Sequence, residues 1–482
     1  MVTGQMSVAR NYVYNTVLQI TNIIVPFITV PYLSRVLGPE GVGIVAFSGS
    51  IVHYFILFGV LGLTLYGNRS IAYVGTNIEE RSKVFWELVL LKVATSSLSL
   101  VAFYLFLQAT SPKNLSVYLV QSTLIIAAAL DVSWLFMGME DFKKTVTRSL
   151  FMKMLGTALI FILVKSSEDF ALYALIGAGT TLFGQLIMWT YVPKYIEKVS
   201  LHSLKFRRHL RGTFRLFIPT VAVEVYVVLD KTMIGLISTD AEVGIYEMSQ
   251  RLVKMALSLV TSMGVVMIPR MSAVVARRDP DLLNSYAKRS FHFATYGSIF
   301  VTTMIMGVIP DFAPMFFGEA FLKTIDVIRT IVPIAVFIAW SNVLGMQLMV
   351  PMKLERKLTL SVSLGAMINF PLNLILIPFL GAVGAAISSV VAEFSVTASQ
   401  LFLMRKEIKI SSLFSEFHKH LLSGIAALAC MSSIALLPFS SLILVFLELI
   451  VGTITYLVMQ RLLKTEINTM VIAKLRSFLK RS

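Results

Sequence analysis

The sequence predicts an all-α polytopic membrane protein of about 14 transmembrane helices, on the strength of its composition and its hydropathy pattern. Of the 482 residues, 56% are hydrophobic and only 14% are charged, and the mean hydropathy is +0.80. Soluble domains carry about 25% charged residues, so this chain lacks the charged shell that a soluble protein of its size requires. These values exclude a typical cytosolic enzyme, a secreted disulfide scaffold and a disordered chain.

Each predicted span is an apolar run of at least about 18 residues, which is long enough to cross a bilayer as a helix. The runs are apolar on all sides, whereas the strands of a membrane barrel alternate in segments of about 10 residues. Two runs are less regular, because the ninth ends near Pro310 and the tenth contains Arg329. The predicted spans cover residues 12–34, 42–65, 84–109, 117–138, 146–165, 171–192, 213–237, 243–268, 291–312, 326–350, 358–379, 383–404, 420–438 and 440–461.

The placement of the basic residues predicts the orientation of the chain. The net charge is +16, which in a soluble protein would suggest nucleic-acid binding. With a cytoplasmic N-terminus, only four of the 42 lysines and arginines fall in the outer loops, namely Arg35, Lys113, Lys165 and Lys323. Cytoplasmic loops are enriched in Lys and Arg. Both termini are therefore predicted to be cytoplasmic, with no nucleic-acid partner. The first residues lack a basic segment, so no cleavable signal peptide is expected.

The spans predict a division into two similar lobes and a C-terminal addition. Residues 1–205 form a predicted six-helix N-terminal lobe, and residues 206–410 a second six-helix lobe. Residues 411–482 add two helices and a basic cytoplasmic tail. The second span opens with Val42-Gly43-Ile44 and the eighth with Val243-Gly244-Ile245. Because each lobe has an even number of spans, the repeat is predicted to be parallel.

Two adjacent spans carry charges that are costly inside a membrane and therefore mark candidate functional positions. The charged residues are Glu224, Asp230 and Lys231 in the seventh span, and Glu247, Arg251 and Lys254 in the eighth. The last three fall at i, i+4 and i+7, which places them on one helix face. Either these charges pair between helices or they line a polar cavity. A cavity is the preferred interpretation, because apolar packing joins helices without the desolvation penalty.

The first span carries a row of amides on one face. Asn11, Asn15 and Asn22 lie at i, i+4 and i+11, with Arg10 at the cytoplasmic edge. The amides either hydrogen-bond a neighbouring helix or form another wall of the same cavity. Lys92, in the third span, is expected to extend its ammonium group to the membrane interface.

No pattern in the sequence supports catalysis. It contains no GxxxxGK[ST] phosphate loop and no HExxH zinc motif, and Cys430 is its single cysteine. Short predicted loops leave no room for a soluble catalytic domain. The sequence therefore predicts a carrier and not an enzyme. Its net basic cavity favours an anionic substrate, and the carboxylates beside that cavity suggest a cation or a proton as the driving species.

Several segments resemble one family of membrane proteins, the Wzx-type polysaccharide flippases. The resemblance covers residues 10 to about 460, and its most specific part is the N-terminal segment. The segments are Arg10-Asn11-Tyr12 with Asn15, PYLSRVLGPEGVG at 31–43, LDKTMIG at 229–235, IPRMS at 268–272 and GAVGAA at 381–386. The family belongs to a superfamily that also contains lipid II flippases and multidrug exporters.

The resemblance implies two six-helix lobes with two extra helices in a bacterial plasma-membrane protein. It also implies a substrate, an undecaprenyl-diphosphate-linked oligosaccharide that moves from the inner to the outer leaflet by alternating access. The resemblance implies no cofactor. It does imply coupling to a sodium or proton gradient. The implied partners are this glycan lipid, membrane lipids and polysaccharide-assembly proteins, and a monomer suffices for the mechanism. The alternatives are a flippase for teichoic-acid precursors and a small-molecule or drug exporter.

With that substrate, each candidate residue takes a role. The diphosphate is assigned to four basic residues, Arg10, Lys231, Arg251 and Lys254, because guanidinium and ammonium groups bind phosphate oxygens. The sugar hydroxyls are assigned to Asn11, Asn15 and Asn22. Charge balance or binding of a coupling ion, with sodium as the candidate metal, is assigned to Glu224, Asp230 and Glu247.

Overall fold

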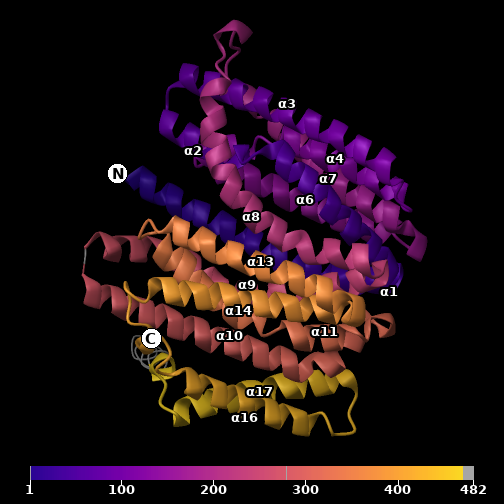
Figure 1. The fold of residues 1–482 in the computed structure, drawn as a ribbon, viewed down its shortest axis with the longest axis vertical. Helices are drawn as coiled ribbons and strands as arrows, with labels where there is room; N and C mark the ends of the chain where they lie inside the picture. The colour runs from indigo at the N-terminus through magenta and orange to yellow at the C-terminus, as the bar shows by residue number, and fades with distance from the viewer. Residues whose placement is uncertain (1, 278, 470–482) are drawn as a thin grey trace. The chain divides into compact units, whose positions relative to one another are not determined.

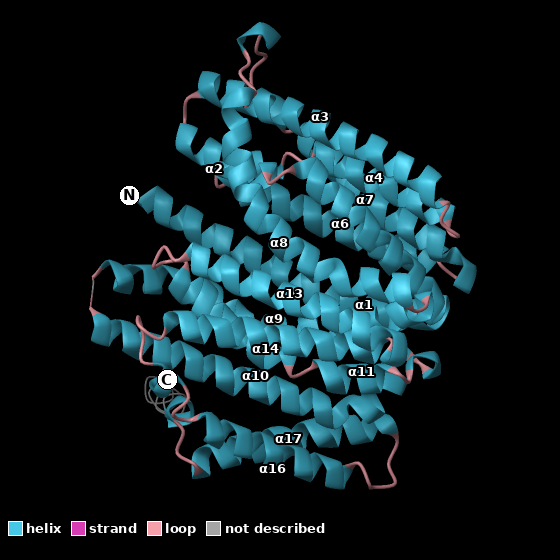
Figure 2. Ribbon diagram, viewed as in Figure 1, coloured by secondary structure: helices cyan, strands magenta, loops and turns pink. Residues whose placement is uncertain are grey.

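The computed structural model describes residues 2–277 and 279–469 of the chain. Within these ranges the side chains of residues 2–13, 15, 201, 218, 219, 222, 223, 259, 262–266 and 269 are not described. The described part contains helices joined by short loops and no strand (Figure 2). Ten of its helical segments are long and apolar enough to cross a membrane. The predicted all-α polytopic class is therefore confirmed.

The contacts divide the chain into two compact units, Met1–Gly244 and Ile245–Ser482, which we call unit 1 and unit 2. Unit 1 contains helices α1 to α8 and the beginning of α9, Asp240–Ala276 (Figure 1). The eight helices are α1 Val2–Val60, α2 Leu63–Val74, α3 Ile78–Thr110, α4 Leu115–Leu130, α5 Ser133–Gly138, α6 Phe142–Leu163, α7 Phe170–Trp189 and α8 Arg207–Ile237.

Unit 2 contains the rest of α9 and the helices that follow it. These are α10 Pro280–Phe317, α11 Thr324–Ile331, α12 Ile334–Ser341, the π-helix Asn342–Met349, α13 Glu355–Leu380, α14 Ala382–Met404, α15 Ile410–Leu413, α16 Phe417–Ile434 and α17 Ser441–Leu462. The C-terminal pair α16 and α17 packs along α10 (Figure 1). The ninth predicted span was expected to end near Pro310, but α10 continues through that residue to Phe317.

The first two predicted spans form one continuous helical element with a single non-helical residue. That residue is Gly38, with φ 66° and ψ 177°, a region that is essentially restricted to glycine. No neighbour lies within 4 Å of where a Cβ would stand, so the backbone conformation and not packing requires glycine here. Pro39 then begins the next helix, a position that proline favours. Pro26 and Pro31 also lie inside α1.

Two predicted spans are broken. The span predicted at 117–138 divides into α4 and α5 at Asp131, whose carboxylate Oδ1 accepts the Ser133 backbone N–H at 2.9 Å. The span predicted at 326–350 divides into α11, α12 and the π-helix. Pro333 immediately precedes α12 and has no backbone N–H to continue the helical ladder. A hydropathy profile reports only that a segment is apolar, so it does not detect such breaks.

Helix α8 packs with unit 1, although the predicted second lobe begins at residue 206. The carboxylate of Glu87 on α3 is 1% exposed and fixes the start of α8. It accepts the Lys205 backbone N–H at 2.6 Å, the Arg208 Nε–H at 2.8 Å and a bond from His209 Nε2 at 2.6 Å. The predicted lobes 1–205, 206–410 and 411–482 follow the sequence repeat and stay a prediction.

Each unit has its own aromatic core. In unit 1, Phe85 of α3 packs against Trp134 of α5 with ring centroids 5.6 Å apart. In unit 2, Phe291 of α10 stacks on Trp340 of α12 at 5.3 Å. Large apolar side chains also remain on the surface, and Phe379 and Leu436 are each 85% exposed. Such exposure is stable where lipid surrounds the helices.

Candidate functional site

A cavity of about 330 Å³ lies within unit 1, between α1, α6 and α7. We call it the α6–α7 cavity. Its volume falls within the range of sites that bind small polar molecules. The polar side chains that line it are Thr29 of α1, Arg148, Ser149, Lys153 and Thr157 of α6, and Tyr173, Thr180, Thr181 and Gln185 of α7. It therefore combines two cations with hydroxyl and amide groups inside helices that are apolar elsewhere.

Neighbouring side chains orient the guanidinium of Arg148. Its Nη1 donates to Gln185 Oε1 at 2.8 Å, and its Nη2 donates to Ser149 Oγ at 3.1 Å. A planar guanidinium held by two partners is suited to a phosphate or carboxylate, because its donors form a fixed fork. The sequence analysis counted Arg148 only as a topology signal. Arg148 lies five residues before Lys153 in the same apolar span. Two basic residues within one span are the sequence feature that could have indicated a basic cavity.

Lys153 joins the cavity to the predicted amide face of α1. Its Nζ donates to Asn22 Oδ1, which fixes the amide orientation. Among the candidate sugar ligands, Asn22 has a described side chain, and that side chain contacts Lys153 in the wall of this cavity. The side chains of Arg10, Asn11 and Asn15 lie outside the described part of the structure.

The candidate residues of α8 lie in unit 1, in a polar contact with α1. Glu224 Oε2 lies 3.1 Å from His53 Nε2, so an ion pair is available when the imidazole is protonated. Asp230 is only 5% exposed, and Lys231 beside it is half-buried. Directly after Lys231, Thr232 donates to Ser50 Oγ of α1 at 2.9 Å. The charges of the seventh span therefore belong to a polar interface inside unit 1.

In unit 2, the charged stripe of α9 is hydrogen-bonded along its own helix. Arg251 Nη2 donates to Glu247 Oε1 at 2.7 Å. Lys254 Nζ donates to Gln250 Oε1 at 2.9 Å. The i, i+4 spacing that the sequence showed produces both pairs. Within this unit Lys254 is exposed and Arg251 is half-buried.

Unit 2 contains a smaller, largely apolar cavity with a few polar groups beside its π-helix. The cavity has a volume of about 170 Å³, and its lining includes Arg289, Ser290, Asn342 and Gln347. Gln347 Nε2 donates to Asn342 Oδ1 at 3.3 Å. Single π-helical turns are frequent at functional sites. No sequence pattern signals such a turn, so the sequence analysis did not find this cavity.

Lys92 corrects one expectation from the sequence. It does not extend to an interface but is 1% exposed, and its Nζ donates to the Asp131 carbonyl at 2.9 Å. The Asp131 carboxylate lies 3.6 Å from the same ammonium group. The break between α4 and α5 frees that carbonyl to accept a bond, which is why the lysine turns inward.

Comparison with known proteins places this geometry in a family. Residues 8–275, more than half of the chain, match the family described as "Polysaccharide biosynthesis protein". The chain belongs to this family. A curated relative from Escherichia coli (strain K12), a "Putative O-antigen transporter", is 25% identical over 409 residues. That alignment covers 84% of this chain and 98% of the relative.

Solved structures show the same fold in other transporters. "Lipid II flippase MurJ, inward closed conformation" has a TM-score of 0.77 at 13% identity, covering 94% of this chain and 98% of that chain. An inward-facing multidrug resistance MATE family transporter of the MOP superfamily has a TM-score of 0.62 at 13% identity, covering 86% and 95%. These likenesses confirm the polytopic fold. Together with the family and its transporter relatives, they confirm that this polysaccharide biosynthesis protein is a multi-pass membrane transporter and not an enzyme.

Proposed function

We propose that this protein flips an undecaprenyl-diphosphate-linked oligosaccharide from the inner to the outer leaflet of the bacterial plasma membrane. The observation that carries the proposal is the alignment with a putative O-antigen transporter over 98% of that relative's length. O-antigen, capsule, wall and teichoic-acid precursors share a lipid-linked phosphate. The proposal therefore rests on the lipid-linked phosphate that these precursors share. A flipping assay with several glycan types distinguishes among them.

The chemistry of the α6–α7 cavity supports an anionic, hydroxyl-rich substrate. A diphosphate carries fixed negative charge and several acceptor oxygens, which Arg148 and Lys153 match with N–H donors. Asn22, Gln185 and the threonines supply partners for sugar hydroxyls. The prenyl chain needs no polar site, because it stays in the lipid around the exposed apolar side chains.

The remaining candidate residues keep their proposed roles. Arg10, Lys231, Arg251 and Lys254 contribute to the positive field for the diphosphate, and Asn11 and Asn15 bind sugar. Glu224, Asp230 and Glu247 balance that charge or bind the coupling sodium ion or proton. One chain completes the alternating-access cycle, with its termini in the cytoplasm.

A reconstituted flipping assay tests the proposal. Purified protein is placed in liposomes with fluorescent undecaprenyl-diphosphate oligosaccharides of the O-antigen, capsule and teichoic-acid types. The fraction that reaches the opposite leaflet is measured with and without sodium and proton gradients. We expect protein-dependent movement of at least one glycan type, accelerated by one gradient.

Charge-removing variants locate the substrate path. Arg148→Gln with Lys153→Gln, and separately Arg251→Ala, are expected to lower the flipping rate at least about tenfold, because each removes a charge-assisted phosphate contact. Lys83→Ala is the matched control, since Lys83 pairs with Glu79 outside the α6–α7 cavity. Wild-type rates in all folded variants would refute the site assignment. The absence of movement with every glycan type would refute the function.

A further inference from the structure

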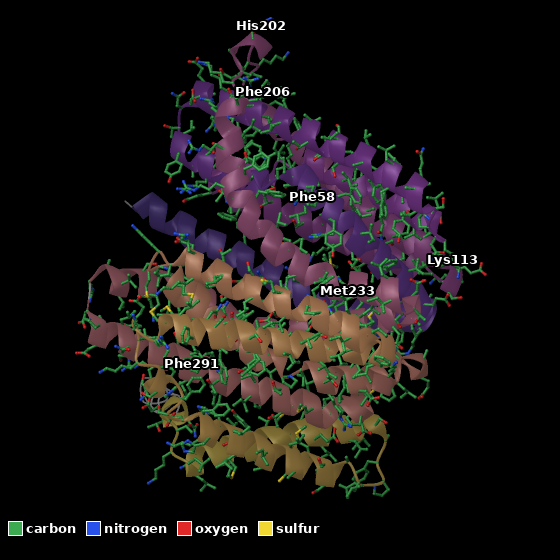
Figure 3. All side chains as sticks on the ribbon, in the orientation of Figure 1. Phe58, Lys113, His202, Phe206, Met233 and Phe291 are labelled. Atoms are coloured by element: carbon green, nitrogen blue, oxygen red, sulfur yellow. The ribbon has the colours of Figure 1, made fainter. Side chains whose placement is uncertain are left out.

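Three side chains from distant parts of unit 2 converge at one end of α10. His292 lies in α10, Glu416 immediately precedes α16, and Glu466 follows α17. One ligand atom from each lies within 4.8 Å of the others. Phe291, the sequence neighbour of His292, is labelled in Figure 3 near the end of the described C-terminal segment. The proposed transport function assigns no role to this cluster.

The imidazole of His292 presents an unpartnered nitrogen to the two carboxylates. Its Nε2 lies 3.3 Å from the Ser412 carbonyl and 3.2 Å from Ser415 Oγ, so the tautomer with its hydrogen on Nε2 donates to the carbonyl and leaves Nδ1 open to a ligand. Its Nδ1 is buried and has no hydrogen-bond partner among the described residues, and the whole residue is 1% exposed. A histidine that binds a metal through one nitrogen usually donates its other N–H to a backbone carbonyl. His292 has this arrangement.

The distances around Nδ1 fit a metal ion better than a hydrogen bond. Glu416 Oε2 and Glu466 Oε2 each lie 3.6 Å from Nδ1. That separation is too long for a hydrogen bond. Two ligands of a tetrahedral ion at about 2.0–2.1 Å from the metal stand roughly 3.3 Å apart, so each carboxylate oxygen needs to approach Nδ1 by only a few tenths of an ångström.

Two lysines hold the far oxygens of the same carboxylates. Lys419 Nζ donates to Glu416 Oε1 at 2.9 Å, and Lys288 Nζ donates to Glu466 Oε1. Each lysine holds one oxygen of its glutamate, and the other oxygen of that carboxylate lies toward Nδ1. The Glu466 backbone N–H also donates to Glu416 Oε2 at 3.0 Å, which fixes the two acidic segments against each other. The site is held in place before any ion arrives.

We propose that His292, Glu416 and Glu466 bind a divalent transition-metal cation that fastens the α16–α17 hairpin to α10. One imidazole nitrogen and two single carboxylate oxygens suit zinc or manganese. Calcium takes six to eight oxygen ligands, and these residues offer too few. Water occupies the fourth position. The ion gives the C-terminal hairpin an attachment that does not depend on apolar packing.

Metal analysis of the purified full-length protein tests this site. The affinity tag is removed, bound metal is stripped with a chelator, and the protein is dialysed against Zn²⁺. We expect about one zinc ion per chain and a rise in the thermal unfolding midpoint that Mg²⁺ does not produce. His292→Ala and Glu466→Gln are each expected to weaken zinc binding at least about tenfold.

His418→Ala is the matched control, because His418 is an exposed histidine two residues from Glu416. This variant is expected to keep the full zinc content. The Glu466 side chain is 45% exposed, so Glu466→Gln folds even where removal of the buried imidazole prevents folding. Zinc content equal to wild type in Glu466→Gln would overturn the proposal. Absence of zinc from the wild-type protein would also overturn it.

Discussion

Glu448 of α17 carries a buried carboxyl group without a hydrogen-bond partner among the described residues. Its side chain is 0% exposed, and neither carboxylate oxygen has a hydrogen-bond partner in the described part of the chain. A buried polar group without a partner destabilises a fold, and an apolar residue of similar volume removes that penalty. Glu448→Met is therefore expected to stabilise the protein by about 1–3 kcal/mol, seen as a higher unfolding midpoint in detergent.

Glu168→Met provides the comparison, because Glu168 is exposed, and its unfolding midpoint is expected to stay at the wild-type value. Flipping by the Glu448 variant is expected to continue at the wild-type rate. A folded Glu448→Met protein that no longer transports would contradict this interpretation. It would instead assign the carboxyl group to coupling.

Lys92 is also buried, but its ammonium group contacts Asp131. Its replacement is therefore expected to destabilise the protein. Lys92→Met leaves the Asp131 carbonyl and carboxylate without the ammonium group that they now contact. Breaking one side of a buried ion pair costs about 3–5 kcal/mol. Adding Asp131→Asn restores part of that loss, because the amide is neutral and still caps α5 through Ser133. Unfolding of the two single variants and the double variant measures the coupling, and simple additivity would argue against the pair.

At this scale the sequence identifies residue types but not their partners. The sequence places Lys92 inside a predicted span, yet the lysine's inward turn depends on a carbonyl released by a helix break. Arg148 and Lys153 were not singled out, because a basic residue near a span end has the same appearance as a topology signal. The described contacts supplied the missing information by bringing Lys153 to Asn22.

At the scale of elements, the two glycine motifs of the sequence repeat meet each other within unit 1. A Cβ on Gly43 would lie 1.6 Å from the Asp240 carbonyl oxygen, and one on Gly244 would lie 2.0 Å from the Pro39 carbonyl oxygen. The starts of the two helical segments therefore touch backbone to backbone. Gly43→Ala or Gly244→Ala is expected to destabilise the protein by about 3 kcal/mol or more, because backbone atoms must separate.

Gly179→Ala is the matched control for both substitutions. Gly179 is also helical, and nothing lies within 4 Å of its Cβ position. Alanine there is expected to be neutral or stabilising by up to about 1 kcal/mol, since it favours the helix. The unfolding midpoints of the three purified variants decide the question. Equal stability of Gly43→Ala and Gly179→Ala would rule out the close approach.

The sequence predicts a helix correctly where the length of an apolar run determines it. It does not predict the features that tertiary contacts determine. The break between 34 and 42 was anticipated from hydropathy, and the structure places its centre at Gly38. The division at Asp131 and the π-helix Asn342–Met349 were not anticipated, because both lie within segments whose average hydropathy is that of a continuous span. The repeated Val-Gly-Ile sequence indicated only an internal repeat, and the contact between its two glycines comes from the structure.

At the scale of the whole molecule, a transporter needs a fixed orientation in the membrane. The asymmetry of Lys and Arg predicts that the loop after α3 is outside and the connection between α7 and α8 is cytoplasmic. Figure 3 shows Lys113 and His202, one from each of these connections, at opposite ends of unit 1. Both residues are exposed, so a cysteine at either position is accessible to a reagent in its compartment.

Cysteine labelling tests that orientation directly. The single native cysteine, Cys430, is exposed, so it is first replaced by serine. In this background Lys113→Cys is expected to react with a membrane-impermeant maleimide in intact cells. His202→Cys is expected to react only after the membrane is permeabilised, because the basic residues around it hold that connection at the cytoplasmic face. Labelling of His202→Cys in intact cells would reverse the topology. It would also place the cations of the connection on the side where the glycan is released, which would contradict the proposed direction of transport.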